Sequence, residues 1–326
     1  MVMLSGSFTG MLVLIFDGKA AAEGIRHGIE ICLQTLIPSL FPFFLLSGII
    51  TASLVGQPIP CLSIIGKFCH IPRGSESLLA VGILGGYPVG AGMVWNAHRD
   101  GLLTADEANR MVIFCNNAGP SFLFGILSHF FPSVTYVWCL WGIQVFAALL
   151  TGFLIGGNDR AITMARTGTF RLSDVMNRSI RNMSTVCGWV ILFRMILEFL
   201  DRWLFQMVTP ETQVILTGFL ELSNGCLRLQ AIPDTGTRFL LATVMLSSGG
   251  LCILMQTLSV FPRLRMKQYI LGKTIHLILS TMLSVCMLWF LTGRFILCSV
   301  NLFIFIAGVS LITCKSRNNK LTVAFP

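Results

Sequence analysis

The sequence predicts an all-α polytopic membrane protein with about eight transmembrane helices and two re-entrant helical hairpins in inverted repeats. Its 326 residues are 54% hydrophobic and only 11% charged, with a mean hydropathy of +0.79. A soluble domain carries about 25% charged residues, so these charges are too few to cover a soluble surface. The net charge of +9 comes from Lys and Arg in short connections, which indicates topology control rather than nucleic-acid binding. We treat residues 1–326 as one domain in the lipid bilayer.

The first two apolar segments are expected to be spans. Residues 1–16 resemble a signal sequence, but no Lys or Arg precedes the apolar run, so we predict a retained helix. Residues 28–56 are long enough to cross a bilayer, with a bend at Pro38 and Pro42.

The stretch GILGGYPVGAGMV, residues 82–94, is too apolar for a surface loop and too rich in Gly and Pro for one helix. Irregular backbone is tolerated at membrane depth only inside protein or beside a wet cavity. About ten residues on each side of the break reach about 15 Å, half of a 30 Å hydrocarbon core. Residues 75–96 are therefore predicted to form a re-entrant hairpin.

The next helix has a start signal and then a break. Thr104 and Glu107 have the spacing of a capping box, in which each side chain accepts a free amide. The helix leads into a span over 112–131 that CNNAGPS, residues 115–121, interrupts. Residues 134–156 form an uninterrupted linking span.

The same order recurs in the second half. Residues 183–200 form a span, and a hairpin over 210–230 starts at Pro210 and breaks at ELSNG, residues 221–225. A span over 239–260 is interrupted by SSGG, residues 247–250, and a C-terminal helix pair over 274–313 follows.

The distribution of positive charge tests this layout. With both hairpins re-entrant, one side carries 16 Lys and Arg and the other five. The richer side is predicted to be cytoplasmic and holds both termini. Its segments are 57–77, 96–112, 157–183, 261–273 and 314–326.

The layout makes repeat 1, residues 28–131, and repeat 2, residues 183–260, opposite in orientation, because a single span separates them. Inverted repeats with broken helices at matching places predict a substrate site near the membrane midplane and alternating access.

Several motifs resemble one known family. LIPSLFPF, GGYPVGA, the helix that begins at Thr104 and FCNNAGPSFLFG occur in that order within about residues 28–260. ELSNG is similar to the family's Glu-x-x-Asn-Gly pattern. The sequence thus resembles the YlbJ-like sporulation integral membrane proteins of the nucleoside-recognition or Gate domain group, relatives of concentrative nucleoside transporters. It departs from them in its many cysteines and in Ser247-Ser248, where repeat 1 has Asn116-Asn117.

The resemblance implies movement of dipicolinic acid from mother cell to forespore across the outer forespore membrane; the cell membrane is the other location. A site for this aromatic dianion needs amide donors, helix N-termini and an apolar wall. Glu221 is expected to bind a coupling ion, H⁺ or Na⁺, or to pair with a cation. Arg194 is expected to neutralise a substrate carboxylate or to pair with Glu198. The candidate substrate-binding residues are Tyr87, Pro88, Gly90, Asn116, Asn117, Gly119, Ser121, Arg194, Glu221, Ser223, Asn224, Gly225 and Ser248.

Other function classes lack a signature. The sequence has no C-x-x-C pair, clustered histidines, P-loop or catalytic triad, so we expect no metal, no cofactor and no enzyme activity. A transporter of nucleosides or another small solute, and a membrane scaffold for sporulation proteins that transports nothing, stay open as alternatives. So does a homo-oligomer.

Overall fold

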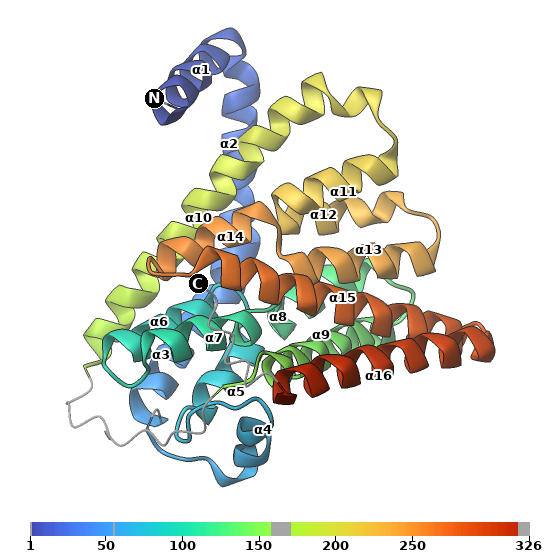
Figure 1. Ribbon diagram of the computed structural model, residues 1–326. Helices are drawn as coiled ribbons and strands as arrows, with labels where there is room; N and C mark the ends of the chain where they lie inside the picture. Colours follow the sequence, from blue (N-terminus) through green and yellow to red (C-terminus); the bar gives the residue numbers. More distant parts are fainter. Residues whose placement is uncertain (1, 55, 158–170, 319–326) are drawn as a thin grey trace.

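The computed structural model describes residues 2–54, 56–157 and 171–318, and this part of the chain is built from α-helices and short helical turns (Figure 1). The helices are α1 (Val2–Phe16), α2 (Gly18–Ile31), α3 (Ile37–Leu54), α4 (Ser63–Phe68), α5 (Glu76–Gly85), α6 (Val89–Arg99), α7 (Ala105–Cys115), α8 (Pro120–Ile126), α9 (Val134–Ile155), α10 (Leu172–Trp203), α11 (Pro210–Leu220), α12 (Leu222–Arg228), α13 (Thr235–Ser248), α14 (Gly250–Val260), α15 (Met266–Leu291) and α16 (Phe295–Asn318). A five-residue π-helical turn, Cys32–Leu36, joins α2 to α3.

Six helical segments of the described chain are long and apolar enough to cross a membrane, which confirms the all-helical membrane class. They coincide with six of the eight expected spans. The two other expected spans correspond to shorter apolar helices, α1 with 15 residues and Phe295–Ser310 of α16. The six segments are Gly18–Leu54, Ala105–Phe130, Val134–Ile155, Leu172–Trp203, Thr235–Val260 and Met266–Leu291.

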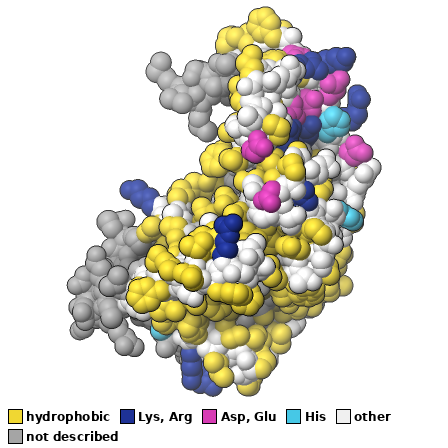
Figure 2. Space-filling model, turned by 90° about the vertical axis from the view of Figure 1, so that its right-hand side faces the viewer, with side chains coloured by type: hydrophobic (Ala, Val, Ile, Leu, Met, Phe, Trp, Pro, Cys, Tyr) yellow, Lys and Arg dark blue, Asp and Glu magenta, His cyan; other side chains and the backbone are white. Residues whose placement is uncertain are grey.

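The long helix α10 runs diagonally across the molecule beside α2, and α15, α9 and α16 lie together on another side (Figure 1). Gly24 on α2 lets α10 approach closely, because a Cβ at this position would lie 2.7 Å from Met195 Cα. Large apolar side chains such as Trp138, Phe146 and Ile278 are exposed on the outer faces. Figure 2 shows a broad hydrophobic surface, with acidic and basic side chains gathered towards one end. This surface suits contact with lipid.

Helix breaks occur at the four expected places. Gly86, with φ +73°, separates α5 from α6, and residues 116–119 separate α7 from α8. Glu221 separates α11 from α12, and Gly249, with φ +74°, separates α13 from α14. The re-entrant and inverted-repeat assignments stay predictions, since helix bounds alone do not decide how each pair is inserted.

The predicted helix-start signals are confirmed. Glu107 N donates to Thr104 Oγ1 at 3.2 Å and Thr104 N donates to Glu107 Oε2 at 2.8 Å, which completes the capping box. Thr209 caps α11, with Pro210 at its first position. These local contacts set where both helices begin.

The first hairpin packs its glycines on the break of the next helix pair. Gly86 lies against Gly119, and Gly90 lies so close to the end of α7 that a Cβ would meet Cys115 O at 2.0 Å. The contact joins backbone to backbone and leaves no side chain that can move aside. The hairpin tip is therefore held directly by the α7–α8 break.

We expect Gly90→Ala to destabilise the protein by about 1–3 kcal/mol, because the methyl group must displace the backbone at Cys115. The measurement is the melting temperature of purified protein in detergent. Gly125→Ala on α8 is the matched control, since nothing lies within 4 Å of a Cβ there. Equal melting temperatures for the two variants would contradict the close contact.

Candidate functional site

A small cavity lies where the tip of the first hairpin meets the break of the second. It is walled by Gly86 and Tyr87 from the first hairpin and by Glu221 from the second. Its volume of about 30 Å³ has room for water but not for a dicarboxylate. Five of the candidate residues line it: Tyr87, Gly119, Ser121, Glu221 and Ser223. We call it the central cavity.

Glu221 is the N-cap of α12. Its carboxylate accepts from Ser223 N at 3.0 Å, Asn224 N at 2.7 Å and Asn224 Nδ2 at 2.7 Å. The side chain is 1% exposed, and no described Lys or Arg forms an ion pair with it. N–H groups at the start of α12 thus bond this buried carboxyl group, in place of a cation. In contrast, the Ser121 hydroxyl is buried at the cavity without a hydrogen-bond partner.

Asn116 and Asn117, at the α7–α8 break, do not line the central cavity. Asn116 instead connects this break to α14 and α15. Asn116 Nδ2 donates to Thr257 Oγ1 at 3.0 Å and to Tyr269 OH at 3.1 Å. Asn117 Nδ2 donates to Phe114 O at 2.7 Å. Both asparagines are buried. In this conformation they organise the wall of the cavity and do not line it.

Lys273 bonds both of these asparagines, although the sequence analysis placed it in a loop. Its ammonium donates to Asn116 O at 2.5 Å and Asn117 Oδ1 at 2.8 Å, and it lies 5.1 Å from the Tyr87 ring centre. The charge count placed Lys273 in the loop 261–273, and the structure corrects this. α15 begins at Met266, and Lys273, 6% exposed, lies two turns inside it. Without Lys273 the charge counts become 15 and five, so the bias persists.

Four other candidate residues lie around three of the helix breaks. Pro88 precedes α6, and Gly90 packs on Cys115 O. Gly225 packs on the backbone of Gly218, and Ser248 Oγ donates to Met245 O at 3.2 Å. None of the four lines the central cavity. Their contacts instead support close packing of the broken helices.

Arg194 lies in an ion-pair network at another part of α10. It bonds Glu198 Oε2 at 2.7 Å and Asp201 Oδ2 at 3.4 Å, and Asp201 also pairs with Arg228. Arg194 does not line the central cavity. Of the two expected roles, the structure provides the pairing with Glu198. Arg228, through Asp201 and Gln213, links the base of the second hairpin to α10.

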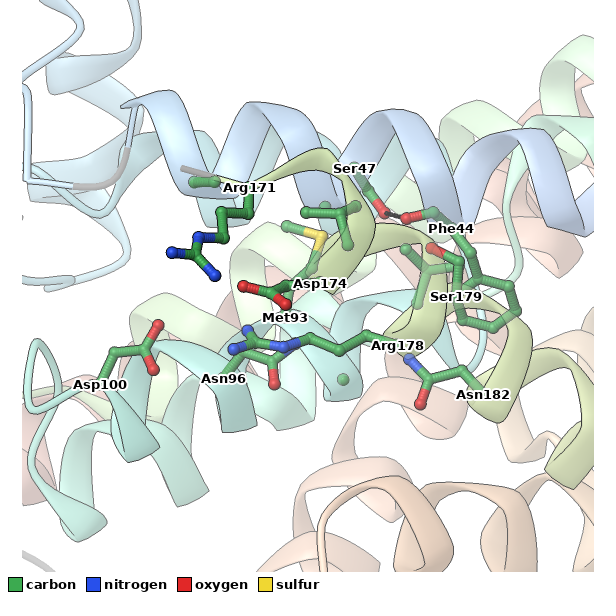
Figure 3. Close-up of a pocket in the computed structure, with 15 residues that line it drawn as sticks. Phe44, Ser47, Met93, Asn96, Asp100, Arg171, Asp174, Arg178, Ser179 and Asn182 are labelled. Atoms are coloured by element: carbon green, nitrogen blue, oxygen red, sulfur yellow. Dashed lines mark hydrogen bonds between the residues drawn. The ribbon is translucent and has the colours of Figure 1, made fainter. Parts of the chain in front are cut away.

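A larger opening lies between α6, α10 and the end of α14, with a volume of about 420 Å³. A smaller pocket beside it, drawn in Figure 3, extends towards α3. Figure 3 shows Arg171, Arg178, Asp100 and Asp174 gathered around this space. We call the two pockets together the vestibule. Their charged lining residues are Arg99, Arg171, Arg178, Arg181, Asp100 and Asp174, four cations and two anions.

The vestibule and the central cavity are lined by the same three parts of the chain: α3 with the turn before it, the first hairpin, and α10. On α10, Arg178 and Asn182 line the vestibule, and Val186 and Val190, at four-residue spacing, line the central cavity. Residues three or four apart share one face of a helix, so these four side chains line both spaces from one face of α10. No described residue lines both spaces. Phe44 and Val89 line the vestibule, Leu40 and Val186 line the central cavity, and all four belong to one buried hydrophobic cluster. We call this group the constriction.

One curated protein matches the chain in a sequence comparison. It is the sporulation integral membrane protein YlbJ of Bacillus subtilis (strain 168), 22% identical over 279 residues, which cover 72% of this chain and 68% of that protein. The chain is YlbJ-like. This agrees with the family indicated by the motifs around the breaks. No family model matches the chain, and no solved structure matches it.

The protein therefore combines a small central cavity, a vestibule with more cations than anions and an apolar constriction between them. The Ser121 hydroxyl, buried without a hydrogen-bond partner among the described residues, and the N-terminus of α12 lie at the central cavity. Among the described residues, no cluster of His, Cys, Asp or Glu has metal-binding geometry.

Sequence reasoning missed two features of this YlbJ-like chain. Lys273 was assigned to a loop, and Gln256, which lines the central cavity, was not singled out. The available signal was the apolar run that starts at Met266 and contains Lys273 and His276. Ionisable residues inside a membrane helix are candidates for function by default.

Proposed function

We propose that this membrane protein transports a small anionic metabolite by alternating access, with dipicolinate as the substrate during sporulation. The observation that carries the proposal is that one face of α10 lines both a vestibule with excess positive charge and a cavity beside two broken helix pairs. Similarity to a sporulation integral membrane protein supports the cellular role. No chemical reaction on the substrate is required.

The chemistry of the route agrees with an anion. Four arginines and two aspartates give the vestibule an excess of two positive charges, which concentrates small anions near its mouth. At the central cavity, the Ser121 hydroxyl and the Tyr87 ring offer a hydrogen bond and a flat aromatic wall. A dicarboxylated aromatic ring needs both kinds of contact.

The small size of the central cavity implies that transport requires a conformational change. A space of about 30 Å³ cannot hold dipicolinate, so the constriction must open before the substrate reaches Tyr87. We assign this state as closed, with the vestibule on the mother-cell side and both termini there, in the outer forespore membrane. The positive charge of the loops supports that orientation.

The direct test is uptake of labelled dipicolinate into vesicles that contain the purified protein, with empty vesicles as the background. We expect saturable uptake that unlabelled dipicolinate inhibits and uridine does not. Uridine uptake without dipicolinate uptake would support the nucleoside transporter. Correctly folded protein that transports neither compound would overturn the proposal and support the scaffold.

Arg178→Gln should weaken substrate capture. Arg178 is half-buried in the vestibule and forms no ion pair with a described residue, so its charge is free to attract an anion. Loss of about 1 kcal/mol of attraction should raise the KM for dipicolinate roughly fivefold and leave the maximal rate nearly unchanged. Lys267→Gln, which removes an exposed charge away from the vestibule, is the control. Equal KM values for both variants would contradict a capture role.

A further inference from the structure

A row of buried polar side chains runs along one face of α15, inside the protein. Lys273, His276, Ser280 and Ser284 are spaced three or four residues apart, so they share a face. His276, Ser280 and Ser284 are fully buried and Lys273 nearly so. We call these four residues the polar row. A membrane protein places such groups in its interior at a cost, which by default indicates a function.

The row is bonded to α9 and α13. His276 Nε2 lies 3.1 Å from the Gln144 carbonyl oxygen, and Gln144 Nε2 donates to Ser247 Oγ at 2.8 Å. Thr243 Oγ1 and Ser284 Oγ are 2.8 Å apart. Polar contacts therefore extend from the α7–α8 break along the helix interface.

Three polar atoms on this interface have no hydrogen-bond partner: His276 Nδ1, Gln144 Oε1 and Ser280 Oγ. Because Nε2 faces a carbonyl, it carries the hydrogen of the neutral imidazole, and Nδ1 then presents a free lone pair. Most buried polar atoms in proteins are paired, so these three unpaired atoms indicate that a ligand binds here.

Lys273 connects the polar row to the central cavity. It holds Asn116 O and Asn117 Oδ1 and lies over the ring of Tyr87, which is a wall of the cavity. Hydrogen bonds from an ammonium are roughly twice as strong as those from a neutral amine. A change in the charge of Lys273 would alter the support of the cavity wall directly.

We propose that Lys273 and His276 form a proton-binding site that couples a proton gradient to transport. The site holds one proton at a time, on Lys273 Nζ or on His276 Nδ1, so either the ammonium or the imidazolium is present. It enters from the aqueous phase on one side and leaves on the other, and no substrate bond is broken. The coupling to substrate rests on the proposed transport function, whereas the proton site itself does not.

A proton suits this site better than Na⁺. Na⁺ requires several oxygen ligands, and a neighbouring ammonium would repel it. The titratable side chains that face Lys273 and His276 are Cys115 from α7, Tyr87 from the first hairpin and Tyr269 on α15 itself. The residues described from α9 and α13, Gln144, Thr243 and Ser247, do not titrate. Among the described residues, no carboxylate is bonded to Lys273 or His276.

The test uses full-length protein in vesicles and compares accumulation with exchange. An inward proton gradient should drive accumulation of labelled dipicolinate by the native protein, and a protonophore should abolish it. Lys273→Arg keeps the positive charge but cannot deprotonate. It should lose accumulation at least tenfold and retain more than about half of the exchange of internal for external dipicolinate at equal pH. His276→Gln should behave in the same way.

A second measurement does not depend on the substrate. The melting temperature of native protein in detergent should change in a step as the pH is varied, because a buried group that titrates links stability to pH. Lys273→Arg and His276→Gln should lack this step. Exposed controls, Lys267→Arg and His129→Gln, should keep it.

The outcomes separate the two proposals. Accumulation by Lys273→Arg at the native level, or driven by Na⁺ and insensitive to protonophore, would overturn the proton site. A pH step that survives both substitutions would also overturn it. A step that depends on both residues, in native protein that does not exchange dipicolinate, would support the proton site and overturn the proposed substrate.

Discussion

Substitution of Glu221 by Ala is expected to reduce dipicolinate uptake at least tenfold. The carboxylate accepts the backbone N–H groups of Ser223 and Asn224 and the amide of Asn224, all in a buried position. Each buried donor left without a partner costs about 1–3 kcal/mol, and a factor of ten requires only 1.4 kcal/mol. The start of α12 would therefore shift or fray, and the wall of the central cavity would change with it.

The measurement is the initial rate of uptake at equal amounts of inserted protein. Asp234→Ala is the matched control, because Asp234 also caps a helix, accepting from Thr237 N at 2.6 Å, but at an exposed site. Water can replace that cap, so its loss should cost little stability and leave uptake unchanged. Glu221→Asp retains a capping carboxylate and should recover part of the rate. Native uptake by Glu221→Ala would contradict a role for this cap in transport.

Substitution of Gly92 by Phe is expected to reduce uptake to the level of empty vesicles. Gly92 on α6 lines both parts of the vestibule, and a Cβ there would meet only Asn182 Nδ2, at 3.5 Å. The backbone therefore accepts a side chain, and an aromatic ring would occupy the route. Gly92→Ala should retain most of the uptake, because its methyl group fits in ordinary contact.

The control for bulk is Gly188→Phe on the exposed face of α10, where nothing lies within 4 Å of a Cβ. It should leave uptake unchanged. The melting temperature in detergent shows whether Gly92→Phe folds, and Asn182→Phe obstructs the same vestibule from α10 if it does not. Native uptake by a folded Gly92→Phe protein would mean that the substrate takes another path.

The elements that local chemistry controls could be predicted from the sequence. The Thr104 capping box, the Thr209–Pro210 start of α11 and the four helix breaks all appear at the expected residues. Capping and helix breaking act over a few residues, so they are visible in a short stretch of chain. Hydropathy likewise indicated the membrane helices, because lipid contact selects apolar residues along a whole segment.

The candidate site was predicted in part. Tyr87, Gly119, Ser121, Glu221 and Ser223 were selected at breaks that are far apart in the sequence, and the fold brings them to one cavity. Asn116 and Asn117 were selected for the same reason, yet their side chains face Lys273, Thr257 and Tyr269. A break indicates that polar groups are present, but the direction of each side chain depends on which helix packs beside it.

By itself, the sequence determined that this is a helical membrane protein with helix breaks at four places. Only the tertiary structure decided which charges lie inside. Arg194 is neutralised by Glu198 and Asp201, whereas Lys273 lies in the interior against the break of α7 and α8. The two side chains look alike in a hydropathy profile. Their surroundings come from helices distant in the chain, and a buried charge acquires its partners only when those helices pack together.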